Sequence, residues 1–230
     1  MSDLDATTPR VFLARHGETE WTKNGRYTGS TELDLTLNGI KQATSTAAQL
    51  VGPGNLIDYN RLIQIFVSPR KRAQQTFQHL FGIETAASLD KVELTEDITE
   101  WDYGEYEGMV VNDIRETRRE KELDRKKKWD IWRDGCEGGE SAKQVEERLD
   151  RLISKIRDIQ RPHMNGERPA DILLVAHGLI LRVFVKRWLG YAVDFPLQIM
   201  LSPGAIGILG YKNHNIDEPA LFVGMSLPAK

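Results

Sequence analysis

The chain has 230 residues, of which 40% are hydrophobic and 28% charged, so it can form one domain with a substantial core. Its net charge of −3 argues against binding to nucleic acid or to an anionic membrane. Its single cysteine, Cys136, excludes an internal disulfide, and no stretch approaches the roughly 18 apolar residues of a membrane-spanning helix. We expect one domain over residues 1–230, a flexible N-terminus over residues 1–9, and a cytoplasmic location with the nucleus left open.

The first predicted element is a buried strand that ends in a charged residue and an imidazole. An apolar run begins at Val11 and stops at Arg15-His16-Gly17. The following residues 20–35 lack a helical period, so we expect a long loop there, with Tyr27 and Thr28 as candidates for contacting a substrate or for packing the loop. The next element is a helix from Leu37 to about Leu50.

Two further apolar runs end in the same way. Residues 63–67 run into Ser68-Pro69, which we expect to cap and open a helix that directs Arg72 inward, and residues 172–176 run into His177-Gly178. In a parallel sheet with helical crossovers, such strand ends lie side by side and helix N-termini point at the same crevice. Two imidazoles, guanidiniums and oriented N–H groups suit a tetrahedral oxyanion such as phosphate.

Three stretches between and after these strands complete the pattern. Residues 98–108 are dense in acids and aromatics and include Glu100, whereas the charge run over residues 112–128 is typical of a solvated helix face. Long helices are expected over residues 145–160 and 179–189. Arg182 lies in the second of these, and on a buried face it would need an anion.

Other functions for these residues have to be weighed. A lone histidine at a strand end is more often structural than catalytic, and Arg72 alone would suit a helix surface. A metal site is the sharper rival, but the sequence has neither a His-x-His nor a His-Glu-x-x-His motif. Arginines beside the histidines would also repel a divalent cation. We therefore expect no metal site and no cofactor.

The motifs that carry a family resemblance follow one another along nearly the whole chain. They are Arg15-His16-Gly17-Glu18-Thr19, Ser68-Pro69 with Arg72-Ala73 and Gln75-Thr76, Glu100 ahead of Tyr103-Gly104 and Glu107-Gly108, and Ala176-His177-Gly178. In this order they resemble the histidine phosphatase superfamily, whose members are also called phosphoglycerate mutase-like. The resemblance implies an α/β fold, a three-layer α/β/α sandwich with a mostly parallel central sheet.

The resemblance also implies a role for each catalytic candidate. His16 would attack phosphorus and become phosphohistidine, while Arg15, Arg72 and His177 surround the phosphoryl oxygens. Glu100 would protonate the leaving alkoxide and then draw a proton from the attacking water. A phosphate monoester needs this charge neutralisation, positioning and leaving-group protonation.

Finer details favour a phosphatase over a mutase. Glycolytic mutases have arginine where this chain has Trp101 and asparagine where it has Thr22, another substrate-binding candidate. Three segments are most similar to the fungal sedoheptulose-1,7-bisphosphatase branch of the family: residues 100–108, 132–137 and 214–219. This branch implies a small phosphorylated sugar as substrate. The residues that would bind it are Arg72, Glu100, Trp101, Asp102, Tyr103, Arg182 and His214.

Within that set, Arg182 and His214 would hold the phosphate that is not cleaved. Between Leu189 and Ile206 the chain is shorter than expected for the branch, which puts sugar specificity in doubt. A bisphosphoglycerate-dependent mutase, a broad-specificity or protein phosphatase, and a non-catalytic phospholigand-binding module stay open as alternatives. We expect no nucleic-acid or membrane partner, and self-association into a homo-oligomer stays open.

Overall fold

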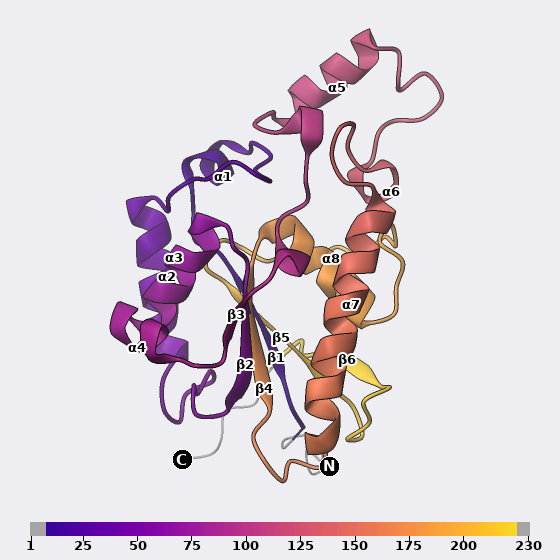
Figure 1. Cartoon of the computed structure of the whole chain (residues 1–230). Helices are drawn as coiled ribbons and strands as arrows, with labels where there is room; N and C mark the ends of the chain where they lie inside the picture. The colour runs from indigo at the N-terminus through magenta and orange to yellow at the C-terminus, as the bar shows by residue number, and fades with distance from the viewer. Residues whose placement is uncertain (1–7, 225–230) are drawn as a thin grey trace.

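The computed structural model describes residues 8–224 (Figure 1). Most of the flexible segment expected over residues 1–9 therefore lies outside the described residues. Of the two that are described, Thr8 is 5% exposed. Between residues 8 and 224, no helix combines the length and the apolar character needed to cross a membrane. The single-domain organisation stays a prediction.

The centre of the molecule is a sheet whose described strands follow the order β3-β2-β4-β1-β5-β6. The strands are β1 (Val11–Arg15), β2 (Leu62–Val67), β3 (Val92–Leu94), β4 (Asp171–Ala176), β5 (Ile206–Tyr211) and β6 (Pro219–Leu221). Strands β1, β2, β3 and β4 run parallel to one another, whereas β5 pairs antiparallel with β1 and β6 antiparallel with β5. This confirms the predicted mostly parallel sheet.

Helices cover both faces of the sheet, which confirms the three-layer α/β/α sandwich. The α-helices are α1 (Glu20–Asn24), α2 (Leu37–Leu50), α3 (Lys71–Phe81), α4 (Ile83–Ser88), α5 (Val111–Glu120), α6 (Ile131–Asp134), α7 (Ala142–Gln160) and α8 (Gly178–Trp188). Short 3₁₀ turns are η1 (Glu96–Ile98), η2 (Gly104–Tyr106) and η3 (Arg161–His163). Helices α2, α3 and α4 lie on one face, and α7 and α8 on the other (Figure 1).

Three predicted boundaries are wrong for local reasons. The loop expected over residues 20–35 contains α1, because Thr19 and Thr22 form a reciprocal cap at its N-terminus. The helix expected to open at Pro69 begins at Lys71. The expected solvated helix over residues 112–128 ends at Glu120, and its Arg118 is only 6% exposed.

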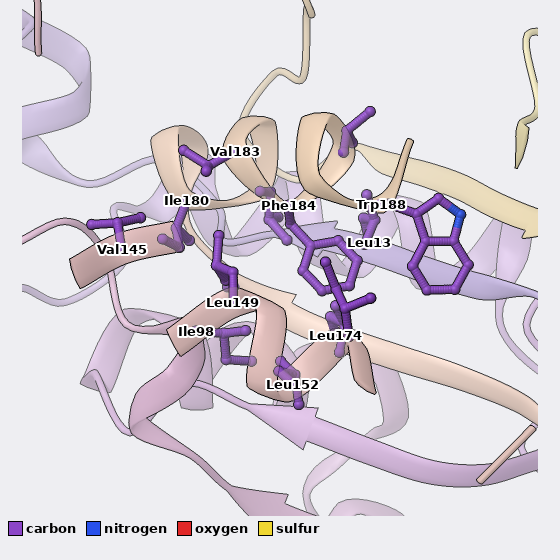
Figure 2. Packing of buried hydrophobic residues seen from close by; sticks show 14 of the residues in the cluster. Leu13, Ile98, Val145, Leu149, Leu152, Leu174, Ile180, Val183, Phe184 and Trp188 are labelled. Atoms are coloured by element: carbon purple, nitrogen blue, oxygen red, sulfur yellow. The ribbon is translucent and has the colours of Figure 1, made fainter. Parts of the chain in front are cut away.

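The core is built on β4, all six of whose residues are buried. Because side chains alternate along a strand, Leu173 packs with the cluster that contains α3, and Leu174 with the cluster that contains α7 and α8. Figure 2 shows Leu174 among side chains of the second cluster, including Leu149 from α7 and Phe184 from α8. Parallel strands buried on both faces read as the continuous apolar runs seen in the sequence.

The register of the sheet brings three strand ends together at one edge. Arg15 of β1 pairs with Ala176 of β4, and Val67 of β2 pairs with Val175 of β4. The residues that follow these strands therefore start from adjacent positions. Since β5 runs the other way, its N-terminal end approaches the same edge.

Replacement of Leu174 by alanine should lower the free energy of unfolding by about 2–5 kcal/mol, because it leaves a cavity in a site that is 0% exposed. Leu37→Ala is the matched control, since Leu37 is 81% exposed, and it should change the free energy by roughly 0.5 kcal/mol or less. Urea denaturation measures both. Equal losses would contradict the described core.

Candidate active site

His16 is buried and held in one orientation by the backbone. Its backbone amide donates to the carbonyl of Ala176 at 2.9 Å, and its ring Nδ1 donates to the carbonyl of Gly17 at 2.7 Å. Since a carbonyl can only accept, the proton lies on Nδ1 and the lone pair on Nε2. Burial, followed by the charge of Arg72, holds the pKa of His16 well below its ordinary value. The imidazole is therefore neutral, as a nucleophile must be.

His177 lies beside His16, with 5.1 Å between the ring centroids. Its Nδ1 accepts from Nε of Arg72 at 3.1 Å, so in the neutral ring the proton is on Nε2. Nε2 in turn donates to Oγ of Ser68 at 2.7 Å. Burial, followed by Arg72, lowers the pKa of His177 well below its ordinary value. Ser68 therefore serves His177 instead of capping a helix that starts at Pro69.

Arg72 is 0% exposed and joins His177 to the loop over residues 28–31. Its two Nη atoms donate to the carbonyls of Thr28 (2.9 Å), Gly29 (3.0 Å) and Thr31 (3.0 Å). The amide N–H groups of Gly29 and Thr31 donate to the carboxylate of Glu107. The loop is thus held through its carbonyls by Arg72 and through its amides by Glu107.

Glu100 is 8% exposed and caps helix α8 from another segment of the chain. Its Oε1 accepts from the amide of Ile180 at 2.9 Å, and its Oε2 from the amide of Leu179 at 3.0 Å. The N-terminus of α8 has no cap from its own side chains. A carboxylate is stabilised there by orphan N–H groups and by the helix dipole. The cap brings Glu100 to the end of β4, next to His177.

A pocket of about 270 Å³ opens between these groups. Its lining residues are Arg15, His16, Thr22, Gly25, Arg26, Tyr27, Thr28, Glu100, Tyr103, Val111, Gly178, Leu179 and Arg182. The lining contains three guanidiniums, those of Arg15, Arg26 and Arg182, and one carboxylate, that of Glu100. Within residues 8–224, the buried Nε atoms of Arg15 and Arg182 have no hydrogen-bond partner. A buried donor without a partner is costly, so the pocket suits an anionic ligand.

Gly178 lets Arg15 approach the N-terminus of α8. A Cβ at this position would lie 2.8 Å from Cζ of Arg15, closer than real Cβ atoms come to another heavy atom. Nη1 of Arg15 donates to the carbonyl of Leu201 at 2.7 Å, in the segment that precedes β5. Burial, the main cause, and the nearby charge of Arg182 lower the pKa of Arg15. Close packing against the Arg15 guanidinium thus explains why glycine follows His177.

Eight of the predicted site residues lie in the pocket wall: Arg15, His16, Thr22, Tyr27, Thr28, Glu100, Tyr103 and Arg182. Arg72 and His177 lie behind this wall and contact each other. The hydroxyl of Thr22 is engaged in the cap of α1. Burial raises the pKa of Tyr103, whose ring meets that of Tyr27 edge to face at 4.6 Å, so both contribute neutral aromatic surface.

Two other predicted residues point elsewhere. Trp101 is 0% exposed in the core, and its indole N–H donates to the carbonyl of Glu140 at 2.9 Å. Asp102 is exposed, and its Oδ1 accepts from the amide of Gly104. Neither lines the pocket. The structure places their side chains in support of the Glu100 segment instead of in contact with a substrate.

The predicted role of His214 in holding the second phosphate needs a correction. His214 follows β5, which runs antiparallel to β1, so it lies at the opposite edge of the sheet from the pocket. Its Nδ1 is 2.9 Å from the carbonyl of Met164, which precedes β4. His214 lies there because β5 runs in the opposite direction to β1 and ends away from the pocket.

The sequence did not single out several residues of the site. Arg26, Val111 and Leu179 line the pocket, while Ser68 and Glu107 orient the groups around it. The motifs contain Ser68 and Glu107, but their residue types alone do not show which backbone groups they meet. Among the described residues, histidine, cysteine, aspartate and glutamate form no group of three or more that could hold a metal ion.

The comparisons with known proteins agree with this geometry. The family model described as "Histidine phosphatase superfamily (branch 1)" matches residues 11–220. A sedoheptulose 1,7-bisphosphatase of Saccharomyces cerevisiae is 37% identical, over 95% of this chain and 93% of that protein. An acid phosphatase of Mycobacterium tuberculosis is 34% identical, over 92% and 91% respectively. Similarity also extends to a 2,3-bisphosphoglycerate-dependent phosphoglycerate mutase of Mesorhizobium japonicum, which is 28% identical over 84% of this chain and 88% of that protein.

Solved structures show the same fold. A functionally characterised open reading frame product of Mycobacterium tuberculosis superposes with a TM-score of 0.71 at 29% identity, over 94% of this chain and 96% of that one. The α-ribazole phosphatase of Shigella flexneri gives a TM-score of 0.73 at 21% identity, over 93% and 95% respectively. At that identity the second match speaks for the fold alone.

Stability should fall as the pH drops below about 6.5, the ordinary pKa of histidine. The folded pKa values of His16 and His177 are depressed, so below pH 6.5 the unfolded chain takes up protons that the folded chain does not. Between pH 6.5 and 5.5, each of the two imidazoles should lower the free energy of unfolding by roughly 1 kcal/mol. Urea denaturation at both pH values measures this.

The matched variant is His16→Asn, whose amide can still donate to the carbonyl of Gly17. It should lose about half of the pH-dependent decrease in stability. An unchanged decrease in this variant would show that His16 does not titrate as described.

Proposed function

Because the chain belongs to the histidine phosphatase superfamily and is a phosphatase, we propose that it hydrolyses a sugar bisphosphate, with sedoheptulose 1,7-bisphosphate as the leading candidate. The chain is 37% identical to a yeast protein named for that activity. The similarity covers nearly the full length of both proteins. The positions of the Arg15 and Arg182 guanidiniums in the pocket also support the proposal.

One observation carries the proposal: the pocket holds two buried guanidinium Nε atoms that lack a partner among residues 8–224. Arg15 lies beside His16, where the phosphate to be cleaved must bind. Arg182 lies on α8, beyond the amides that bind Glu100. A substrate with one phosphate at each position would satisfy both guanidiniums, whereas a monophosphate would satisfy one.

In the proposed first step, Nε2 of His16 attacks phosphorus as the bond from phosphorus to the ester oxygen breaks. Arg15, whose buried Nε has no partner among residues 8–224, neutralises charge on the phosphoryl oxygens, while Arg72 and His177 support the site from behind the pocket wall. Glu100 in its protonated form transfers a proton to the leaving alkoxide. The products are an alcohol, a phosphohistidine and a carboxylate.

In the second step, the Glu100 carboxylate takes a proton from a water molecule that attacks the phosphohistidine. Inorganic phosphate leaves, and His16 and Glu100 return to their starting forms. Oε1 of Glu100 accepts two N–H groups and Oε2 only one, so Oε2 retains capacity for the transferred proton. These steps use protein groups alone, and independence from metal ions stays a prediction.

The mutase alternative receives less support from the structure. Arg133 lies within residues 132–137, one of the segments that are most similar to the sedoheptulose-1,7-bisphosphatase branch. In the structure, two nitrogen atoms of Arg133 donate to the carboxylate of Asp134, at 2.7 and 2.5 Å. A guanidinium already paired in this way is a poor partner for a second phosphate.

Arg182→Ala should raise the KM for sedoheptulose 1,7-bisphosphate by roughly 10- to 100-fold, as expected for the loss of a charged hydrogen bond. The KM for p-nitrophenyl phosphate should change little. Initial rates of phosphate release without added metal measure both, alongside fructose 1,6-bisphosphate and 3-phosphoglycerate.

His214→Ala is the control for the corrected residue, and it should leave both KM values unchanged. Equal effects of Arg182→Ala on bisphosphates and monophosphates would remove Arg182 from the second-phosphate position. Equal rates of the unmodified enzyme on all four substrates would favour a broad-specificity phosphatase instead.

A further inference from the structure

The proton donor Glu100 lies on a segment without regular secondary structure. The stretch between η1 and η2, residues 99–103, forms neither helix nor strand. Thr99, Glu100 and Trp101 are nevertheless buried. Buried backbone amides and carbonyls need partners, and no neighbouring strand supplies them here. Another part of the molecule must therefore fix this segment.

Arg148 of α7 supplies the donors on one side of Glu100. This residue is 7% exposed, and its Nη1 donates to the carbonyls of Asp97 at 2.8 Å and Thr99 at 2.9 Å. Its Nη2 approaches the carbonyl of Glu100 at 3.5 Å. Nε and Nη2 also donate to the two carboxylate oxygens of Glu140, at 2.8 and 2.9 Å. The guanidinium thus binds both its counter-ion and the Glu100 segment.

Glu140 holds the other side of Glu100. Its Oε2 accepts the amide N–H of Asp102 at 3.0 Å, and its own amide donates to the carbonyl of Asp102 at 2.9 Å. The carbonyl of Glu140 accepts the indole N–H of Trp101. A Cβ on Gly139 would collide with the carbonyl of Asp102, so glycine is what permits this close approach of the two backbones.

We propose that the Arg148–Glu140 ion pair is a positioning device for Glu100, an inference that rests on the proposed role of Glu100 as acid and base. The pair holds the backbone before and after Glu100, and the carboxylate itself reaches the amides of α8. A planar guanidinium meets a carboxylate and two carbonyls in a fixed geometry that a lysine ammonium cannot reproduce. The ion pair sets the distance over which Glu100 transfers its proton.

A purely structural role for the pair makes a different prediction. Loss of stability alone would lower the rate on every substrate by a similar factor, because fewer molecules would be folded. Misplacement of a general acid instead harms poor leaving groups selectively, since p-nitrophenolate leaves without protonation. The dependence on leaving group therefore separates the two roles.

The test is Arg148→Lys in the full chain, assayed on an alkyl phosphate and on p-nitrophenyl phosphate. We expect kcat/KM to fall at least about tenfold further for the alkyl phosphate than for p-nitrophenyl phosphate, within the range attributed to general acids. Arg151→Lys is the matched control. Arg151 lies on the same helix and binds the half-buried side-chain carboxylate of Asp97 instead of the backbone. Its replacement should leave the ratio of the two kcat/KM values unchanged.

A double-variant cycle completes the test. Glu100→Gln should itself be selective against the alkyl phosphate, and adding Arg148→Lys should then cause no further selective loss. Independent selective losses in the double variant, or equal losses on both substrates in Arg148→Lys, would overturn the proposal. If Arg148→Lys fails to fold, Glu140→Gln takes its place, with the same expectation and the same refutation.

Glu100→Gln also separates failure of this inference from failure of the proposed function. Selectivity in Glu100→Gln without selectivity in Arg148→Lys would overturn the positioning role and leave the acid role of Glu100 intact. No selectivity in Glu100→Gln would remove Glu100 as the acid and overturn the positioning role with it.

Discussion

The rest of the site depends on the hydrogen bonds that the buried guanidinium of Arg72 donates to His177 and to the loop over residues 28–31. A buried charge is tolerated only when its hydrogen bonds are satisfied, and here His177 and three carbonyls of the loop over residues 28–31 accept them. The same contacts fix the tautomer of His177 and close the loop over the end of β1. Burial is the main cause that lowers the pKa of both His16 and His177, and the charge of Arg72 is the next.

A second buried arginine, Arg148, repeats this arrangement for the Glu100 segment. Both flanking segments of the pocket are irregular, yet each has its carbonyls bound by a guanidinium and some of its amides by a carboxylate, Glu107 or Glu140. Side-chain hydrogen bonds therefore replace the strand pairing that these irregular segments lack. Catalysis of phosphoryl transfer depends largely on such positioning, because the protein contributes little covalent chemistry beyond the nucleophile.

The sequence predicted what local patterns determine. Apolar runs that stop at His16 and His177 located the strands, and parallel pairing brought their ends together. It did not reveal Arg148, since contacts between an arginine and distant carbonyls leave no periodic signal. The prediction for His214 was wrong because a match in sequence position does not show the direction of the preceding strand. Strand β5 follows the shortened segment and runs antiparallel to β1, which carries His214 away from the pocket. Trp101 was misread because aromatic residues suit a pocket wall and a core equally well.

The central claim is that a neutral, buried His16 accepts the phosphoryl group. The most direct measurement is acid-free quenching of the enzyme during turnover of a ³²P-labelled bisphosphate without added metal, followed by peptide mapping. The account predicts an acid-labile, alkali-stable label on the peptide that contains His16, and no label in His16→Asn. A turning-over enzyme without a labelled histidine, or with label on another residue, would contradict it.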